Sequence, residues 1–207
     1  MVERTSDKRH APLEAAPDWS APDLPPLQLP HIHARREHDD GRYQVEELDL
    51  EFSNAERRNY QRLQARGRGA VMIAALPDAE HILLVREYAC GMHRYELGLP
   101  KGRMDSGETP IEAANRELME EVGFGARELR VLRKLSMAPT FMNHEIHLVL
   151  ARDLYPERLP GDEPEPLEVV PWRLDCLHLL TLREDCSEGR SLAAMFVVRE
   201  LLRYGGL

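Results

Sequence analysis

The chain has 207 residues, a formal net charge of −9 at pH 7 and 43% hydrophobic residues. This length suits one domain with or without a tail, and this hydrophobic share is enough to bury a core. No apolar run approaches the roughly 18 residues of a membrane span, and the N-terminus lacks the apolar stretch of a secretory signal. Because so acidic a surface repels a phosphate backbone, a nucleic-acid polymer is a poor partner, whereas a small anion bridged by a divalent cation remains compatible.

The cysteine content bears on the compartment. Cys90, Cys176 and Cys186 are few, odd in number and widely spaced, with no CxxC pair. This pattern favours a cytoplasmic location and argues against a disulfide framework or a zinc site.

Residues 1–40 differ in composition from the rest of the chain. They contain six of the 15 prolines, show no sustained hydrophobic period and mix both charge signs. We expect a flexible, proline-rich N-terminal arm over residues 1–40, with one folded domain over residues 41–207. Apolar residues near the end of the arm could pack on a second subunit of a homodimer; they are Leu24, Leu27, Leu29 and Ile32.

The middle of the chain reads as a series of strands. Alternating apolar residues from Tyr43 to Phe52 predict a first strand, and residues 57–63 could pair back on it as a hairpin across Ser53-Asn54. The apolar run 70–76 predicts a buried central strand, with 81–85 as its antiparallel neighbour. Further short strands are expected at 95–97, 129–135, 146–151 and 167–172.

Two helices are predicted, at 110–122 and 191–203, with a possible shorter one at 174–179. The first is well signalled: Thr109 and Glu112 form a capping box, Pro110 occupies the first helical position, and Gly123 suits a left-handed cap. Helices on both sides of strands predict a layered α-β-α sandwich of the α/β class around a mixed sheet.

Three carboxylates share one side of the first helix. At about 100° per residue, Glu117, Glu120 and Glu121 fall within one arc, next to the apolar stripe that should face the sheet. Like charges on neighbouring turns repel, and only Arg116 offers local compensation. A bound Mg²⁺ would remove the conflict, because it prefers hard carboxylate oxygens and takes substrate phosphates as further ligands. A solvated acidic helix face is the alternative reading of the glutamates alone.

The loop before this helix completes a longer pattern. Gly102 is followed after five residues by Glu108, and after seven more by Arg116-Glu117-Leu118-x-Glu120-Glu121-x-Gly123-Phe124. This segment, 102–124, resembles the signature box of the Nudix hydrolases. Resemblance extends from about residue 42 to 202, and is most specific to the bacterial NudE-type ADP-compounds hydrolases. It includes Val85-Arg86-Glu87-Tyr88-Ala89, Tyr95-Glu96-Leu97-Gly98 and Gly161-Asp162-Glu163-Pro164-Glu165-Pro166.

The resemblance implies a Nudix α-β-α sandwich with a mixed, strongly curved β-sheet and a homodimer. It implies hydrolysis of the diphosphate bond in ADP-X compounds, with ADP-ribose the first candidate and NADH and diadenosine di- or triphosphate also compatible. Two or more Mg²⁺ ions per site, replaceable by Mn²⁺, would support the reaction. In it, a metal-bound water attacks a diphosphate phosphorus in line and AMP is released.

Site residues follow from this resemblance and from the loop before the helix, in which Lys101 and Arg103 could offset phosphate charge and a carbonyl could bind a metal. Metal ligands would be Glu117, Glu120, Glu121 and a backbone carbonyl near Lys101. The general base is expected outside the box, at Glu163 or Glu165 in an acidic loop, with Glu163 preferred and Glu145 a weaker candidate. Glu121 would be the firmest catalytic residue. Substrate contacts are expected at Arg86, Glu96, Arg103 and Pro139, although an ordinary ion pair is as good an interpretation of Arg86.

Two other functions remain open at the level of sequence. One is an RNA 5′-end pyrophosphohydrolase or decapping enzyme, which the acidic charge and the lack of a basic aromatic surface disfavour. The other is a non-catalytic, nucleotide-sensing Nudix-like domain, which would be expected to have lost glutamates that this chain keeps.

Overall fold

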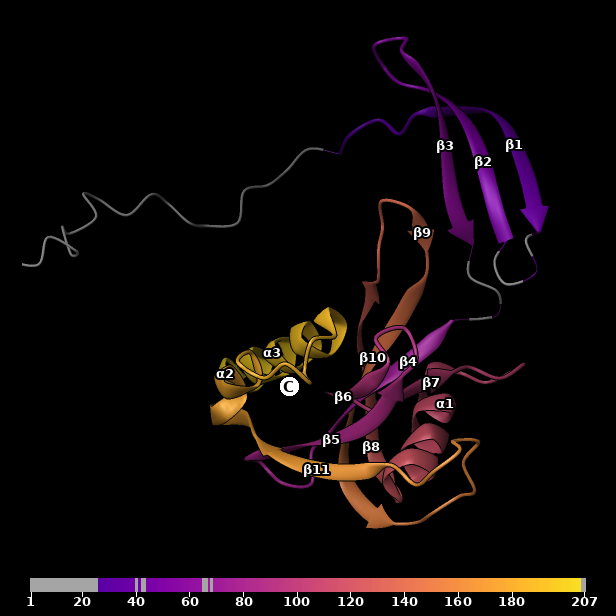
Figure 1. The fold of residues 1–207 in the computed structure, drawn as a ribbon. Helices are drawn as coiled ribbons and strands as arrows, with labels where there is room; N and C mark the ends of the chain where they lie inside the picture. Colours follow the sequence, from indigo (N-terminus) through magenta and orange to yellow (C-terminus); the bar gives the residue numbers. More distant parts are fainter. Residues whose placement is uncertain (1–25, 40, 42–43, 65–66, 68, 206–207) are drawn as a thin grey trace, which may run out of the picture.

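The computed structural model describes residues 26–39, 41, 44–64, 67 and 69–205, and their strands form three sheets (Figure 1). Within these residues no helix has the length and apolar character needed to cross a bilayer. The strands are β1 (His31–Asp39), β2 (Gln44–Glu51), β3 (Arg57–Gln64), β4 (Ala70–Ala75), β5 (His81–Ala89), β6 (Arg94–Gly98), β7 (Lys101–Arg103), β8 (Phe124–Ser136), β9 (Met142–Asn143), β10 (Glu145–Pro156) and β11 (Glu168–Arg173). The helices are α1 (Pro110–Glu117), the π-helical turn η1 (Leu118–Val122), the 3₁₀ turn η2 (Leu174–Cys176), α2 (Leu177–Leu180) and α3 (Gly189–Arg203).

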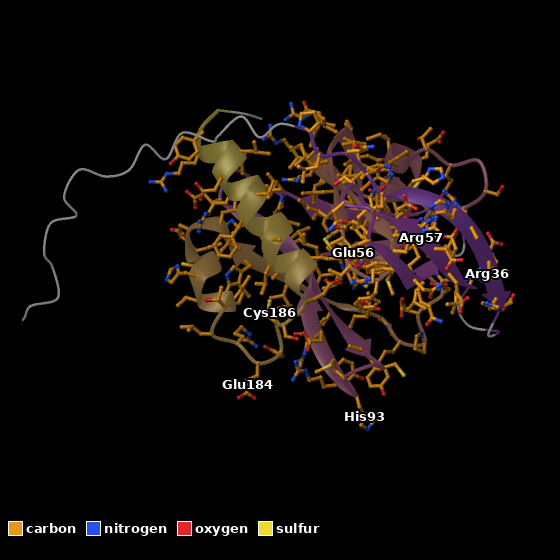
Figure 2. The ribbon with its side chains drawn as sticks, turned by 90° about the horizontal axis from the view of Figure 1, so that it is seen from above. Arg36, Glu56, Arg57, His93, Glu184 and Cys186 are labelled. Carbon is orange, nitrogen blue, oxygen red and sulfur yellow. The ribbon has the colours of Figure 1, made fainter. Side chains whose placement is uncertain are left out.

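The N-terminal sheet has the order β1-β2-β3-β9, and its first three strands are antiparallel neighbours. The predicted hairpin is confirmed, since Glu51 of β2 lies opposite Arg57 of β3. The predicted flexible arm is wrong for residues 31–39, which form β1. Few apolar residues signal this strand, because polar contacts accompany its backbone pairing, such as the 2.9 Å ion pair between Arg36 and Asp49 (Figure 2 labels Arg36). The predictions for residues 1–25 lie outside the described residues.

Two further sheets form the β layer of the larger unit. One is mixed, with the order β7-β4-β10-β8 and a parallel pair between β4 and β10; the other has the order β11-β5-β6. The strand predicted at 81–85 is present as part of β5, but its predicted pairing with β4 is wrong. Both strands are buried on both faces over this part of their length, so their apolar runs carry no information about register or neighbours.

Alternate residues of β4 and β5 point to opposite layers. Val71 and Ile73 pack in the core that includes α1, whereas Met72 and Ala74 pack in the core that includes α2 and α3. Figure 1 shows α1 on one side of the β layer and α2 and α3 on the other. The predicted α-β-α sandwich is therefore confirmed, with a β layer made of two sheets instead of one.

The helix that carries the three glutamates begins as predicted. Thr109 Oγ1 accepts a 3.3 Å hydrogen bond from the Glu112 amide, and the Glu112 side chain accepts one of 2.8 Å from the Thr109 amide. The helix continues through the π turn η1 and ends at Gly123, whose φ of 82° is left-handed. The sequence predicts the extent of this helix and both caps, but not its widened last turn.

Candidate active site

The three glutamates of the box line one pocket of about 290 Å³. Its other wall is the loop from Arg158 to Leu167, which follows β10. Ala114, Leu118 and Val122 are buried against the sheet, and this fixes the rotation of α1 and η1. The same rotation turns the acidic arc toward the loop, so the predicted grouping of Glu117, Glu120 and Glu121 is present.

Glu121 is the most enclosed of these carboxylates. It is 6% exposed, and its Oε2 accepts a 3.1 Å hydrogen bond from the backbone amide of Lys101 in β7. Burial raises the pKa of the Glu121 carboxyl to about 8, and the neighbouring charges of Glu117 and Glu87 add to the rise. A bound cation would favour the charged form that burial opposes.

Glu117 lies against the backbone of Gly102. A Cβ on Gly102 would stand 2.0 Å from the Glu117 carboxylate, so any side chain there would displace it. Burial raises the pKa of Glu117, with further increments from Glu120 and Asp162. The absence of a side chain at Gly102, the first glycine of the box, thus allows the Glu117 carboxylate to lie directly against the Gly102 backbone.

Arg116 provides the positive charge among these carboxylates. Its guanidinium donates to Glu117 at 2.9 Å, to Glu120 at 3.0 Å and to Glu108 at 2.8 Å. It also donates to the backbone carbonyl of Arg103 at 2.8 Å, which ties the helix to β7. Arg116 therefore both offsets the repulsion within the box and joins the loop to the helix.

The side chain of Lys101, expected from the sequence to offset phosphate charge, lies next to a carboxylate. Its Nζ lies 2.5 Å from Glu87 Oε2 in β5, while its amide holds Glu121. Glu87 contributes to the raised pKa of both Glu121 and Glu163, so it belongs to the electrostatic surroundings of the site. No motif separates Glu87 from an ordinary strand residue, and only the packing of β5 beside β7 and η1 brings it here.

The acidic loop brings both candidate bases to the pocket. Glu163 is exposed as a residue, but partial desolvation of its carboxyl raises the pKa of that group. The negative charges of Glu87 and Asp162 raise the pKa further. Glu165 instead accepts a short hydrogen bond from the Tyr95 hydroxyl of β6. Glu163 therefore lies close enough to Glu87 and Asp162 to feel their charges, whereas Glu165 links the loop to β6.

Arg86 and Glu96 already have protein partners. Arg86 donates to Glu168 at 3.3 Å, and its guanidinium carbon lies 5.7 Å from the centre of the Tyr95 ring. Glu96 accepts hydrogen bonds from Arg94 at 2.6 Å and from the amide of Ser187 at 2.9 Å, and it lines a separate pocket of about 400 Å³. Their contacts with a substrate remain a prediction.

Two other predicted contact residues lie apart from the acidic pocket's lining. Arg103 is exposed on β7, and Pro139 lines a cavity of about 320 Å³ between the N-terminal sheet and the β8–β10 connection. Glu145 pairs with Lys134 at 2.9 Å and lines the same cavity as Pro139. Pro139 and Glu145 thus line a different cavity from the box glutamates, whereas the backbone of Arg103 is hydrogen-bonded to Arg116 of the glutamate helix.

The donor set suits a hard divalent cation. Carboxylates of η1, α1 and the acidic loop face one pocket, and their mutual repulsion contributes to the raised pKa of Glu117 and Glu121. Among the described residues, no three acidic, cysteine or histidine side chains are gathered tightly enough to hold an ion as they stand. Arg116 bridges Glu117 Oε1 and Glu120 Oε2, so the second oxygen of each carboxylate could bind a cation while these contacts persist.

Comparison with known proteins defines the class first. The model of the NUDIX domain matches residues 66–192, and that of the NudE-type Nudix hydrolase N-terminal domain matches residues 30–62. The chain belongs to the Nudix hydrolase family. The second match covers β1, β2 and most of β3. These strands belong to the N-terminal sheet, whose first strand could not be predicted from the sequence.

Individual relatives are narrower in their description. The chain is 52% identical over 166 residues to the ADP compounds hydrolase NudE of Escherichia coli, covering 79% of this chain and 88% of that protein. It is 32% identical to an ADP-ribose pyrophosphatase of Bacillus subtilis, over 68% of this chain and 75% of that one. A crystal structure of an ADP compounds hydrolase superposes with a TM-score of 0.79 at 49% identity, covering 88% of this chain and 99% of that one.

Proposed function

We propose that the chain hydrolyses the diphosphate bond of ADP-X compounds with the help of Mg²⁺, releasing AMP and X-phosphate. ADP-ribose is the first substrate candidate, followed by NADH and diadenosine di- or triphosphate. The observation that carries the proposal is the single pocket shared by Glu117, Glu120, Glu121 and the acidic loop. Relatives described as ADP-compound and ADP-ribose hydrolases support the substrate class.

Glu117, Glu120 and Glu121 would hold the cations, with the backbone carbonyl near Lys101 as a further ligand. A divalent cation supplies charge neutralisation for a diphosphate and lowers the pKa of a coordinated water. The Lys101 amide fixes the Glu121 carboxylate, and Gly102 leaves the space in which Glu117 lies. These contacts position the ligands before substrate arrives, which lowers the reorganisation that the reaction requires.

Glu163 is the proposed general base, which accepts a proton from the attacking water. Its raised pKa brings the carboxyl nearer the operating pH, where a base is most effective. Glu165 is the second candidate, although its bond to Tyr95 suits it better to holding the loop. Arg86 is proposed to bind a phosphate as a forked donor, exchanging its exposed ion pair with Glu168 for the substrate.

The test is a substrate panel with Mg²⁺ and with Mn²⁺, scored by AMP release. Glu121→Gln should abolish nearly all turnover while the protein stays folded, because it removes one ligand charge and little volume. Glu184→Gln is the matched control, since Glu184 is exposed and projects away from the molecule (Figure 2). Unchanged metal-dependent AMP release by Glu121→Gln would refute the proposal.

The same panel separates the two alternative functions. Preference for 5′-capped or triphosphorylated RNA over free ADP-ribose would favour the RNA-processing alternative. Tight ADP-ribose binding without any metal-dependent product would favour the sensing domain. Since both outcomes differ from AMP release with free ADP-ribose, one set of assays distinguishes all three.

A homodimer is proposed as the working form. Leu27 and Leu29 are 88% and 85% exposed in the single chain, so this segment has apolar surface to bury against a partner. Sedimentation that gives a monomer at micromolar concentration would contradict it. A cytoplasmic location is proposed from the three cysteines, all of which are free thiols here.

A further inference from the structure

The C-terminal end of the glutamate-bearing helix is capped by a segment distant in sequence. The last carbonyls of a helix lack partners within it and must find donors elsewhere. Here the Glu157 amide donates to Gly123 O at 3.2 Å, and the Leu159 amide donates to Met119 O at 3.3 Å. Two carbonyls at the end of the helix are thus satisfied by the chain that leaves β10.

Arg158 satisfies two more carbonyls from the same segment. Its Nη1 donates to Glu120 O at 3.4 Å and its Nη2 to Val122 O at 3.3 Å. The positive guanidinium also lies at the negative end of the helix dipole, where a cation is favoured. A lysine ammonium is a compact charge that could reach one of these carbonyls but could not span both in the same fixed geometry, so the forked donor suits this contact better.

The backbone of Gly123 makes room for this guanidinium. A Cβ on Gly123 would lie 2.6 Å from Arg158 Nη2 and 2.9 Å from its Cζ. The glycine at this position therefore has two reasons: its left-handed φ of 82°, and the arginine stacked against it. Arg158 is exposed as a residue, and its guanidinium lies close against the helix end at Gly123.

The segment that Arg158 anchors leads directly into the acidic loop. The next residues along the chain, 160–167, line the pocket that contains Glu117, Glu120 and Glu121. At its far end the loop is held by the Tyr95–Glu165 hydrogen bond and by Leu167, which packs against the α1 side of the core. Arg158 and Tyr95 are therefore the two ends of a clamp across the loop that bears Glu163.

We propose that Arg158 is a positioning residue, which sets the distance between the general base of the acidic loop and the cation-binding glutamates by clasping the end of their helix. This inference rests on the proposed function for the role of Glu163. This positioning role acts through the helix end and not through the substrate, although Arg158 also lines the pocket. Its consequence is that proton transfer, and not binding of metal or nucleotide, depends on Arg158.

The variant Arg158→Met removes the fork and keeps much of the side-chain volume. With ADP-ribose and Mg²⁺, we expect kcat to fall about tenfold or more, because small misplacements of a catalytic group are costly. KM and the Mg²⁺ concentration for half-activation should stay within about twofold, since the box glutamates keep their own contacts. The acidic limb of the kcat–pH profile should shift, and Arg158→Lys should restore part of kcat.

Hydrogen exchange supplies a readout that does not depend on activity. The peptide 155–167 should exchange faster in Arg158→Met, through the Glu157 and Leu159 amides, while the peptide 110–118 stays unchanged. Arg173→Met, which removes a surface arginine paired with Asp175, is the matched control and should behave as wild type. Unchanged exchange at 155–167, or unchanged kcat, in Arg158→Met would overturn the inference. If the wild-type chain releases no AMP, the proposed function fails, whereas hydrogen exchange still tests the contact between Arg158 and the helix end. If Arg158→Met does not fold, Arg158→Lys takes its place in both measurements.

Discussion

The buried carboxyl of Glu121 should make the stability of the metal-free protein depend on pH. Its pKa rises from the ordinary 4.5 to about 8 in the folded state. The folded protein then binds this proton more tightly than the unfolded chain does. The stabilising contribution is complete below about pH 4.5, and it is lost as pH rises through about 8.

The magnitude follows from the same values. Because one pKa unit corresponds to about 1.4 kcal/mol, a rise from 4.5 to about 8 amounts to roughly 5 kcal/mol at most. This is a large part of the 5–15 kcal/mol that typically separates folded from unfolded domains. Glu121→Gln cannot ionise, so its stability should fall less between pH 5 and 8.5 than that of the wild type.

Urea denaturation in the presence of a chelator, at about pH 5, 7 and 8.5, measures this difference. The wild-type free energy of unfolding should fall toward high pH, and Mg²⁺ should restore it most strongly at pH 8.5. Glu184→Gln, at an exposed position, should follow the wild type. Parallel pH profiles for wild type and Glu121→Gln would refute the reasoning, because the group would then have the same pKa in both states.

Three further substitutions test separate parts of the site. Gly102→Ala should weaken Mg²⁺ affinity about 10–100-fold by titration calorimetry, since its Cβ would collide with the Glu117 carboxylate. Gly91→Ala, which has open space around it, is the control and should bind Mg²⁺ as the wild type does. Equal Mg²⁺ affinities of the two variants would contradict the steric argument. Thr109→Ala removes the helix cap and should cost about 1 kcal/mol in urea denaturation, and a loss near zero would mean that the cap contributes nothing. Glu163→Gln should lower kcat about 10²–10⁴-fold with little change in KM. The loss of kcat in Glu165→Gln should be smaller. A larger loss in Glu165→Gln would identify Glu165 as the general base.

The sequence by itself determined the helix that carries the glutamates. Its caps at Thr109 and Gly123 and its apolar stripe are local features, governed by neighbours three or four residues away. The spacing of Glu117, Glu120 and Glu121 then dictates one acidic side, whatever the helix packs against. The alternating burial of strands and the α-β-α layering follow from similar short periods, so they too could be predicted.

Apart from the hairpin of β2 and β3, strand order and register could not be predicted from the sequence. The apolar runs of β4 and β5 can pair with almost any buried strand, and β1 is held by backbone bonds and ion pairs that leave no apolar period. Such pairings are decided by the free energy of the whole sheet, because no residue in these strands specifies which strand lies next to it.

The surroundings of the box glutamates depend on tertiary structure. Glu87 reaches Lys101 only because β5 lies near β7, and Arg158 reaches Val122 only because β10 ends beside the last turn of the glutamate helix. These residues are 14 and 36 positions apart, respectively, and no local rule links them. The sequence therefore determined which carboxylates gather on the helix, whereas the fold decided what surrounds them, since the pKa of a buried carboxyl depends on distances through space.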